Sequence, residues 1–144
     1  MIERVVIKLP GAPVAKGRPR FGNGRAYTDA KTIAAEQSIL AAWLTQAGAR
    51  KPHDGPVAVE IVATFIPPAS WPKWKQQAAV NGLWPHMSKP DSDNLAKAVL
   101  DALNGVAWVD DAQVVRHQIE KQYHSTAYTF VAVTFYDMPT KGQA

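Results

Sequence analysis

Charged side chains between residues 89 and 111 have types and a spacing that suit phosphodiester hydrolysis. The acids are Asp91, Asp93, Asp101, Asp110 and Asp111, and Lys97 lies among them. Carboxylate oxygens are the ligands that Mg²⁺ prefers, and Mg²⁺ keeps several bound waters, one of which can serve as a nucleophile. A lysine nearby can offset the negative charge that builds on the phosphate during hydrolysis. Three or four carboxylates that converge with one lysine would therefore form a metal-dependent phosphodiesterase site.

The distribution of charge supports a cation-binding role for these acids. The chain has 144 residues, a net charge of +4 and 12 acidic residues. Five of those acids fall between Asp91 and Asp111. Because like charges repel, such a cluster costs stability unless a cation or a basic side chain neutralises it. The segment is therefore a candidate cation site.

A predicted helix over residues 92–104 positions most of these side chains. Its apolar residues recur at helical spacing and form a stripe that we expect to be buried: Leu95, Ala98, Val99, Ala102 and Leu103. Asp93, Lys97 and Asp101 are each four residues apart and therefore share another face of the helix. Asp91 lies just before the first turn, from which its carboxylate can reach the same region.

Each acid also has a structural interpretation, which is the commoner one for an acid taken singly. Acidic residues are favoured at the start of a helix because they cap it and interact with its dipole. Asp93 and Lys97 are also spaced as an ordinary i, i+4 ion pair. The convergence of three or four carboxylates on one lysine is what favours a metal site over capping.

The remaining sequence predicts an α/β fold with a β-sheet and helices packed on it. Alternating apolar residues predict four strands, over residues 2–9, 56–66, 114–123 and 128–136. We expect the last two strands to form a hairpin across residues 124–126. The length of 144 residues fits a single compact domain over residues 1–144.

A further helix is predicted from Thr28 or Asp29, either of which can cap it, to about Ala47. Its expected buried face carries Ile33, Leu40, Trp43, Leu44 and Ala47. The stretch 70–90 is irregular, with one short helix after Pro72. The two predicted helices are the elements that we expect to cover the sheet.

The composition excludes several classes of protein. No stretch approaches the roughly 18 uninterrupted apolar residues that a membrane span requires. The apolar run Val5 to Ile7 is broken at Lys8, so we expect no signal peptide. The chain has no cysteine, which excludes disulfides and suits a reducing compartment. We therefore expect a soluble cytoplasmic protein that is not attached to a membrane.

The stretch from Lys89 to Val114 resembles the signature of the RusA-type Holliday junction resolvases, which are small endonucleases of bacteria and their prophages. The matching residues are Asp91-Ser92-Asp93-Asn94-Leu95, Lys97, Asp101-Ala102-Leu103 and Asp110-Asp111-Ala112-Gln113-Val114. The early segment Lys16-Gly17-Arg18-Pro19-Arg20-Phe21 is similar to longer phage-borne members.

The resemblance implies a role for each residue of the motif. It implies that Asp91, Asp93 and Asp111 hold Mg²⁺, with Mn²⁺ as a substitute, and that Lys97 acts near the scissile phosphate. Asp110 would then either contact these ligands without binding the metal itself or cap a helix. The resemblance also implies a mixed sheet and a homodimer that resolves four-way junctions by paired nicks during DNA recombination and repair.

This sequence departs from the compact members of the family in two places. Only Lys89 stands where those members have a richer run of basic residues, and the tryptophan-containing stretch 70–86 is an insertion. Both departures concern the recognition of the junction more than the catalysis.

Two basic segments are candidates for contacts with DNA. A glycine-rich loop or hairpin with an Asn-Gly turn carries Lys16, Arg18, Arg20 and Arg25, and the later stretch carries Lys73, Lys75 and Lys89. Basic loops that contact phosphates supply much of the salt-dependent affinity for DNA, although a solvated surface loop is an equally ordinary interpretation of the first segment.

Five aromatic or imidazole side chains have competing interpretations. Trp71, Trp74 and Trp84 either stack on unpaired bases at a branch point or pack within the protein, and packing is the commoner role. His86 and His117 have no metal-ligand partner at a characteristic spacing. Trp43 is expected in the core.

Two other functions remain open beside junction resolution. The chain could be an accessory protein that binds branched DNA without cutting it, in which case the carboxylates are only helix caps. It could also be a metal-dependent nuclease for RNA or flap DNA. Incubation of a labelled four-way junction with and without Mg²⁺ separates these functions.

Overall fold

The chain folds around one mixed four-stranded sheet. The computed structural model describes residues 2–17, 20–27 and 29–143. The sheet consists of β1 (Ile2–Pro10), β4 (Val57–Phe65), β5 (Val114–Tyr123) and β6 (Tyr128–Tyr136), in the order β1-β6-β4-β5. β4 is parallel to β5 and antiparallel to β6, and β6 is antiparallel to β1. The predicted α/β class, the mixed sheet and all four strands are confirmed.

The expected hairpin between β5 and β6 is wrong. β4 lies between these two strands and pairs with both, so the turn at residues 124–126 carries the chain across the end of β4. The hydroxyl of Thr64 at this end donates to the carbonyl of Thr126 at 2.8 Å and accepts from the backbone N–H of Tyr128 at 2.9 Å.

Burial explains why β4 is central and β5 is not. Six of the nine residues of β4 are buried, on both faces of the sheet, whereas most of β5 is exposed. A strand with polar side chains is tolerated at the edge of a sheet, while a strand that is apolar on both faces belongs in the middle. Alternation predicted that β5 and β6 are strands but carried no information about which strand each one pairs with.

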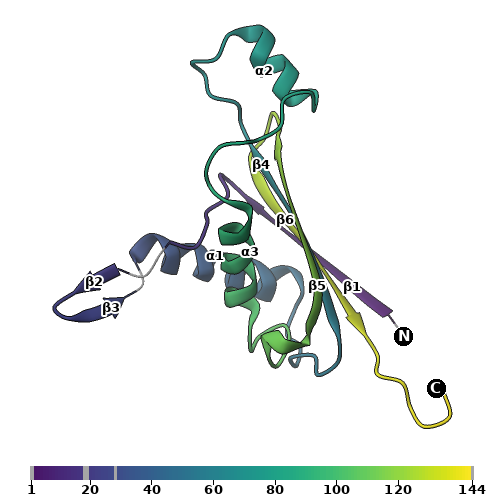
Figure 1. Cartoon of the computed structure of the whole chain (residues 1–144). Coiled ribbons are helices and arrows are strands. Elements are labelled where there is room, and N and C mark those ends of the chain that lie inside the picture. Colours follow the sequence, from purple (N-terminus) through teal and green to yellow (C-terminus); the bar gives the residue numbers. More distant parts are fainter. Residues whose placement is uncertain (1, 18–19, 28, 144) are drawn as a thin grey trace.

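Two helices cover one face of the sheet, as Figure 1 shows. They are α1 (Ala30–Gln46) and α3 (Ser92–Leu103). The core lies between them and the sheet, and its largest fully buried side chains include Trp43, Trp108, Ile7, Ile61 and Leu103. All five residues of the predicted apolar stripe on α3 are buried, and so is Trp43, as predicted.

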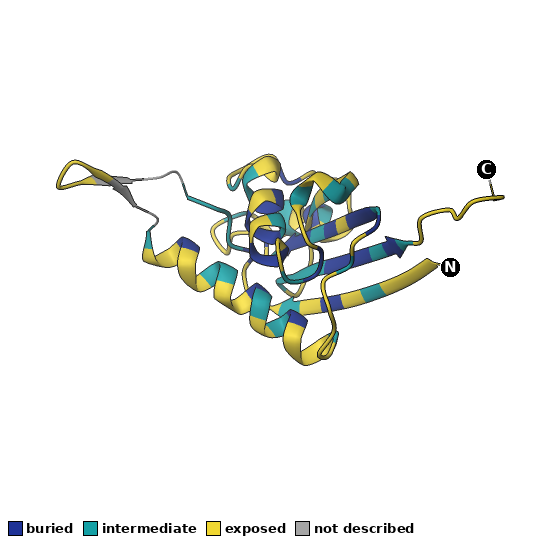
Figure 2. Cartoon of the chain, turned by 90° about the horizontal axis from the view of Figure 1, so that it is seen from below, coloured by how far each residue is buried: buried dark blue, intermediate teal, exposed yellow. Residues whose placement is uncertain are grey.

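The buried face of α1 differs from the predicted one. Thr32, Ile39 and Trp43 face the core, whereas Ile33 is 43% and Leu44 is 55% exposed. The helix is therefore turned by about one residue from the expected phase. Thr32 explains the turn, because its hydroxyl accepts a hydrogen bond from the N–H of Gly17 at 2.8 Å and so must face the segment before the helix. Figure 2 shows the exposed side of α1 in yellow.

Two smaller features project from this body. The strands β2 (Arg20–Gly22) and β3 (Arg25–Tyr27) form a hairpin beside the start of α1, and α2 (Lys73–Val80) lies beyond the far end of the sheet (Figure 1). Asn23 and Gly24 both have positive φ, at 52° and 73°, which is the geometry of the Asn-Gly turn that the sequence predicted. The predicted short helix after Pro72 is also confirmed.

Among the described residues, no helix is long and apolar enough to cross a membrane.

Candidate active site

The first turn of α3 presents two carboxylates and a lysine to solvent. Asp91 is the N-cap residue and Asp93 lies in the first turn. The ammonium nitrogen of Lys97 lies 3.9 Å from a carboxylate oxygen of Asp93, and both side chains are exposed. An exposed pair at this distance contributes little to stability, so neither group is held by the other. All three side chains remain free to contact a ligand.

Asp91 does not perform the structural role that its position allows. Its backbone is extended, with φ −67° and ψ 144°, as an N-cap residue requires, but its side chain makes no capping hydrogen bond. The carboxylate has no hydrogen bond or ion pair to any other described side chain or backbone group. Capping therefore does not explain the acid at this position, in contrast to Asp29, whose side chain accepts from the N–H of Thr32 at 2.7 Å and caps α1.

Lys121 on β5 holds the backbone of the residues that precede Asp91. Its ammonium group donates to the carbonyls of Ser88 at 2.8 Å and Pro90 at 3.1 Å. Sequence analysis did not single out this residue. The signal was present, however, because Lys121 is in phase with Ile119 and Tyr123, which point toward the helix-covered face of the sheet. A lysine in that phase must find polar partners inside the protein.

Asp111 is oriented by a buried tryptophan. It begins the short helix η1 (Asp111–Gln113), and one of its carboxylate oxygens accepts a hydrogen bond from the indole N–H of Trp108 at 2.8 Å. Trp108 is fully buried, so the position of the carboxylate is tied to the core. Asp110 caps η1 instead, accepting from the N–H of Ala112 at 3.2 Å. Capping is one of the two roles expected for Asp110.

The described residues do not contain a preformed metal cluster. No three Asp, Glu, His or Cys side chains within residues 2–17, 20–27 and 29–143 are grouped closely enough to hold a metal ion. Asp91, Asp93 and Asp111 are nevertheless oxygen donors of the type that Mg²⁺ selects, and Mg²⁺ completes its shell with waters and phosphate oxygens. The donor set fits the ion by chemistry, while its assembly around a metal stays a prediction.

Asp101 shares a helix face with Asp93 and Lys97, but its partner lies outside the helix. It accepts a hydrogen bond from Lys16, whose ammonium also lies 3.7 Å from Glu36 on α1. The hydrogen bond to Asp101 raises the pKa of Lys16, and the charges of Asp101 and Glu36 raise it further. Lys16 therefore joins the segment before β2 to both helices, and its predicted contact with DNA would compete with these ion pairs.

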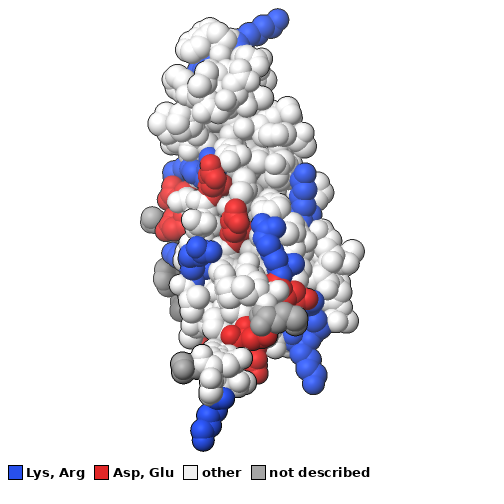
Figure 3. All heavy atoms as spheres, turned by 90° about the vertical axis from the view of Figure 1, so that its right-hand side faces the viewer, with Lys and Arg blue, Asp and Glu red and all other residues white. Residues whose placement is uncertain are grey.

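The other predicted DNA contacts lie on the two projecting features. Arg20 and Arg25 belong to the β2–β3 hairpin, with Arg25 exposed, while Arg18 lies outside the described residues. Lys73 is exposed at the start of α2, and Lys89 is exposed in the segment that precedes α3. On the face seen in Figure 3, lysines and arginines lie around the acids in the middle, and the upper part, which holds α2, carries basic side chains without acids.

Within the part of the chain that the structure describes, neither His86 nor His117 belongs to a group of three potential metal ligands. His86 is buried, with its ring stacked on Phe65 at a centroid distance of 4.0 Å and tilted against Tyr123 at 4.8 Å. Burial lowers the pKa of His86, and the positive charge of Lys121 lowers it further. His117 is exposed on β5. The histidine at position 86 therefore acts as a neutral packing residue.

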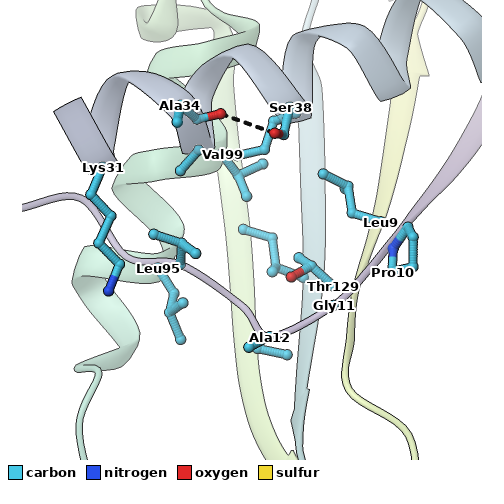
Figure 4. A pocket seen from close by; sticks show the side chains of 15 residues that line it. Leu9, Pro10, Gly11, Ala12, Lys31, Ala34, Ser38, Leu95, Val99 and Thr129 are labelled. Atoms are coloured by element: carbon cyan, nitrogen blue, oxygen red, sulfur yellow. Dashed lines mark hydrogen bonds between the residues drawn. The ribbon is translucent and has the colours of Figure 1, made fainter.

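An apolar cavity of about 240 Å³ lies on the other side of α3 (Figure 4). Leu95 and Val99 of α3 line it together with Ile39 of α1, and Lys31 is its one charged lining residue. Ser38 also lines it, but its hydroxyl is bonded to the carbonyl of Ala34 at 3.0 Å. No acid or histidine lines this cavity, so the candidate chemistry lies at the exposed start of α3.

The fold and the site together define a class of protein: an α/β domain with exposed acids at the start of a helix that packs on a mixed sheet. A family model described as "Endodeoxyribonuclease RusA" matches residues 10–134. The chain therefore belongs to the RusA endodeoxyribonuclease family. The matched range contains Asp91, Asp93, Lys97 and Asp111.

A relative from Bacillus subtilis (strain 168), described as "Uncharacterized protein YqaN", is 35% identical to this chain over 122 residues. The alignment covers 78% of this chain and 83% of the relative. The description of that relative names no activity, so the family model carries the functional information.

Proposed function

We propose that this protein is a Mg²⁺-dependent, structure-selective endodeoxyribonuclease that resolves Holliday junctions by paired nicks, in DNA recombination and repair. One observation carries the proposal. The start of α3, inside the range matched by the family, holds the unpaired carboxylate of Asp91, the exposed carboxylate of Asp93 and a lysine 3.9 Å from the latter. Side-chain capping does not explain Asp91, whereas binding of a metal and a phosphate would use all three groups.

The side chains divide the work as follows. Asp91, Asp93 and Asp111 would hold Mg²⁺, or Mn²⁺ in its place, which supplies an activated water and offsets charge on the phosphate. The ammonium of Lys97 contacts a phosphate oxygen and stabilises the charge that develops there. Trp108 orients Asp111 through its indole N–H, and Lys121 holds the chain that leads into Asp91. The last two are positioning residues that do not touch the substrate.

Branched DNA is the proposed substrate, and the two projecting features are its proposed contacts. Arg20 and Arg25 of the hairpin would bind backbone phosphates on one side of the site. Lys73, Lys75 and Lys89 would do so on the other side. Arg18, outside the described residues, is a proposed contact as well. Contacts spread over two separated features suit a substrate whose arms diverge, because each feature can bind a different arm.

We further propose that the active form is a homodimer. Two equivalent strands of a junction are most simply cut by an enzyme with two-fold symmetry. Ile33, Leu40 and Leu44 lie at helical spacing on the outer side of α1, where Ile33 and Leu44 are exposed in the single chain. An apolar stripe of this kind is normally covered, and a second copy of the chain would cover it.

A non-cleaving accessory protein is the second candidate, favoured by one observation. The described residues contain no assembled group of three metal-binding side chains. A labelled four-way junction incubated with and without Mg²⁺ separates the two functions. Paired nicks that require Mg²⁺ support the nuclease, and binding without nicks supports the accessory protein. Flap DNA and RNA in parallel reactions test the remaining alternative.

A further inference from the structure

The segment between β4 and α3 forms a basic, aromatic projection that the proposed catalysis does not use. We define residues 66–90 as the α2 arm. No acidic residue occurs between Glu60 and Asp91, whereas the arm contains Lys73, Lys75 and Lys89. In Figure 1 the arm lies beyond the end of the sheet, and the chain returns from it to the start of α3. Its surface therefore combines positive charge with the absence of groups that would repel a polyanion.

The arm holds one large aromatic side chain out in solvent. Trp74 is 66% exposed. Its ring makes an edge contact with Trp84 at a centroid distance of 6.4 Å, and Trp84 makes another with Trp71 at 6.1 Å. Trp71 in turn contacts Tyr123 at the end of β5, at 5.3 Å. The exposed ring is thus connected to the sheet by a chain of ring contacts and is not a free side chain on a loop.

A positive charge is fixed within the same ring cluster, beside Trp71 and Trp84. The ammonium of Lys75 lies 4.0 Å from the ring centre of Trp71 and 4.6 Å from that of Trp84. Cation–π contacts of this kind hold a lysine at a defined place. An exposed indole at the outer end of a ring cluster that also holds a fixed ammonium suits single-stranded nucleic acid, in which a base stacks on the ring and a phosphate meets the charge.

We infer that the α2 arm is a binding site for unpaired nucleotides, with Trp74 as the stacking residue and Lys75 as the neighbouring phosphate contact. The inference rests on the proposed function for its source of unpaired bases, which is the branch point of the substrate. Trp84 lies seven positions before Asp91, so at most about 25 Å of chain joins the inner part of the ring cluster to the proposed site.

The test compares single-stranded with duplex DNA in the absence of divalent metal, so that no cleavage occurs. A labelled oligodeoxythymidine and a duplex of equal length are titrated with the full chain, and anisotropy gives the affinity. We expect Trp74→Ala to weaken binding of the single strand at least about fivefold, the lower end of what one stacked base contributes. Binding of the duplex should change less. Trp74→Phe should keep most of the affinity, because the smaller ring still stacks.

Val115→Ala is the matched control, since Val115 is an exposed apolar residue on β5 outside the arm. It should leave both affinities unchanged. Circular dichroism of each variant checks that the fold is kept. An unchanged affinity of Trp74→Ala for the single strand, or an equal loss for single strand and duplex, would overturn the inference.

A lipid surface is the competing partner for an arm with exposed Leu83 and Met87 beside lysines. Vesicles of phosphatidylglycerol provide the comparison. If Trp74→Ala abolishes vesicle binding and leaves oligodeoxythymidine binding intact, the arm is a membrane-docking surface and the inference is wrong. Because the titration needs no cleavage, a protein that binds the single strand through Trp74 but does not cut junctions would contradict the proposed function and leave this inference standing.

Discussion

At the scale of single residues, side chains that look alike in the sequence have different tasks. Asp91 and Asp29 both occupy N-cap positions, but only Asp29 caps its helix. Asp93 and Asp101 share a helix face, yet Asp101 is bonded to Lys16. The first distinction depends on side-chain rotamer and the second on a partner 85 residues away in the sequence. Spacing along one helix contains neither kind of information.

Spacing did identify the local features correctly. The helix around Asp93 and Lys97 and its apolar stripe both depend on residues within a few positions of one another. By contrast, the contacts of Lys121 and Trp108 became visible only with the fold. These two residues orient the acidic segment without being part of its motif.

Trp108→Phe tests whether Asp111 needs its indole donor. The substitution removes the 2.8 Å hydrogen bond and leaves an aromatic ring in the core. Partners that orient metal ligands are typically worth about 10-fold to 100-fold in metal affinity. We therefore expect the Mg²⁺ concentration for half-maximal junction cleavage to rise about 10-fold or more, while the rate at saturating Mg²⁺ changes less. An unchanged Mg²⁺ requirement in a folded variant would remove Asp111 from the metal site.

At the scale of elements, the sequence predicted which segments are helices and strands better than how they pack. The alternation in β5 and β6 is real, but β4 separates these strands because it is apolar on both faces. The face of α1 that packs on the core carries Ile39 and Trp43 together with Thr32, whose hydroxyl accepts from the N–H of Gly17. The Asn-Gly turn, whose geometry depends on two adjacent residues, was predicted correctly, while the segment around it was expected to be either a loop or a hairpin.

The β2–β3 hairpin supplies a prediction about affinity that is separate from catalysis. Arg20→Ala combined with Arg25→Ala should weaken junction binding and reduce its dependence on salt, by about 0.9 in the log–log slope for each phosphate that the variant no longer neutralises. Cleavage should recover at high protein concentration, because the acids on α3 are untouched. The measurement is single-turnover cleavage across a protein titration at two salt concentrations. If affinity and salt slope both stay as in the wild type, the hairpin is an ordinary surface element.

The α2 arm supplies a prediction about pH through His86. Burial and the charge of Lys121 lower the pKa of this histidine below its usual value of 6.5. Above about pH 6.5 the ring is neutral in both the folded and the unfolded chain, so protonation of His86 does not reduce the free energy of unfolding there. As the pH falls from there toward the lower folded pKa, the unfolded chain binds a proton that the folded chain does not, and stability is lost.

The measurement is the urea midpoint between about pH 8 and pH 5, for the wild type and for His86→Phe, which keeps a ring against Phe65. The urea midpoint of the variant should fall less than that of the wild type as the pH is lowered. His117→Gln, at an exposed position on β5, should behave like the wild type. A wild type and a His86→Phe variant with the same pH profile would show that the buried imidazole does not couple to folding.

At the scale of the whole molecule, the sheet carries the helices on one face, and the outer side of α1 is exposed (Figure 2). This side includes the apolar side chains of Ile33 and Leu44. We expect a dimer of the 15.7 kDa chain, held in part by this side of α1. Ile33→Asp combined with Leu44→Asp should shift the protein to monomers, because charged groups there cannot be desolvated without a partner. Light scattering after gel filtration measures the mass. Val115→Asp, at another exposed apolar position, is the control and should remain dimeric.

The central claim is that the carboxylates at the start of α3 are catalytic and not structural. The most direct measurement is Mg²⁺-dependent cleavage of a labelled four-way junction by Asp93→Asn and by Asp101→Asn, two isosteric changes on one helix. Asp93→Asn should abolish cleavage while junction binding is kept or strengthened, because the metal ligand is removed together with a charge that repels phosphate. Asp101→Asn should cut nearly normally, since its partner is Lys16 and an exposed pair of this kind contributes under about 1 kcal/mol. Near-normal nicking by Asp93→Asn, or an inactive Asp101→Asn beside it, would contradict the assignment.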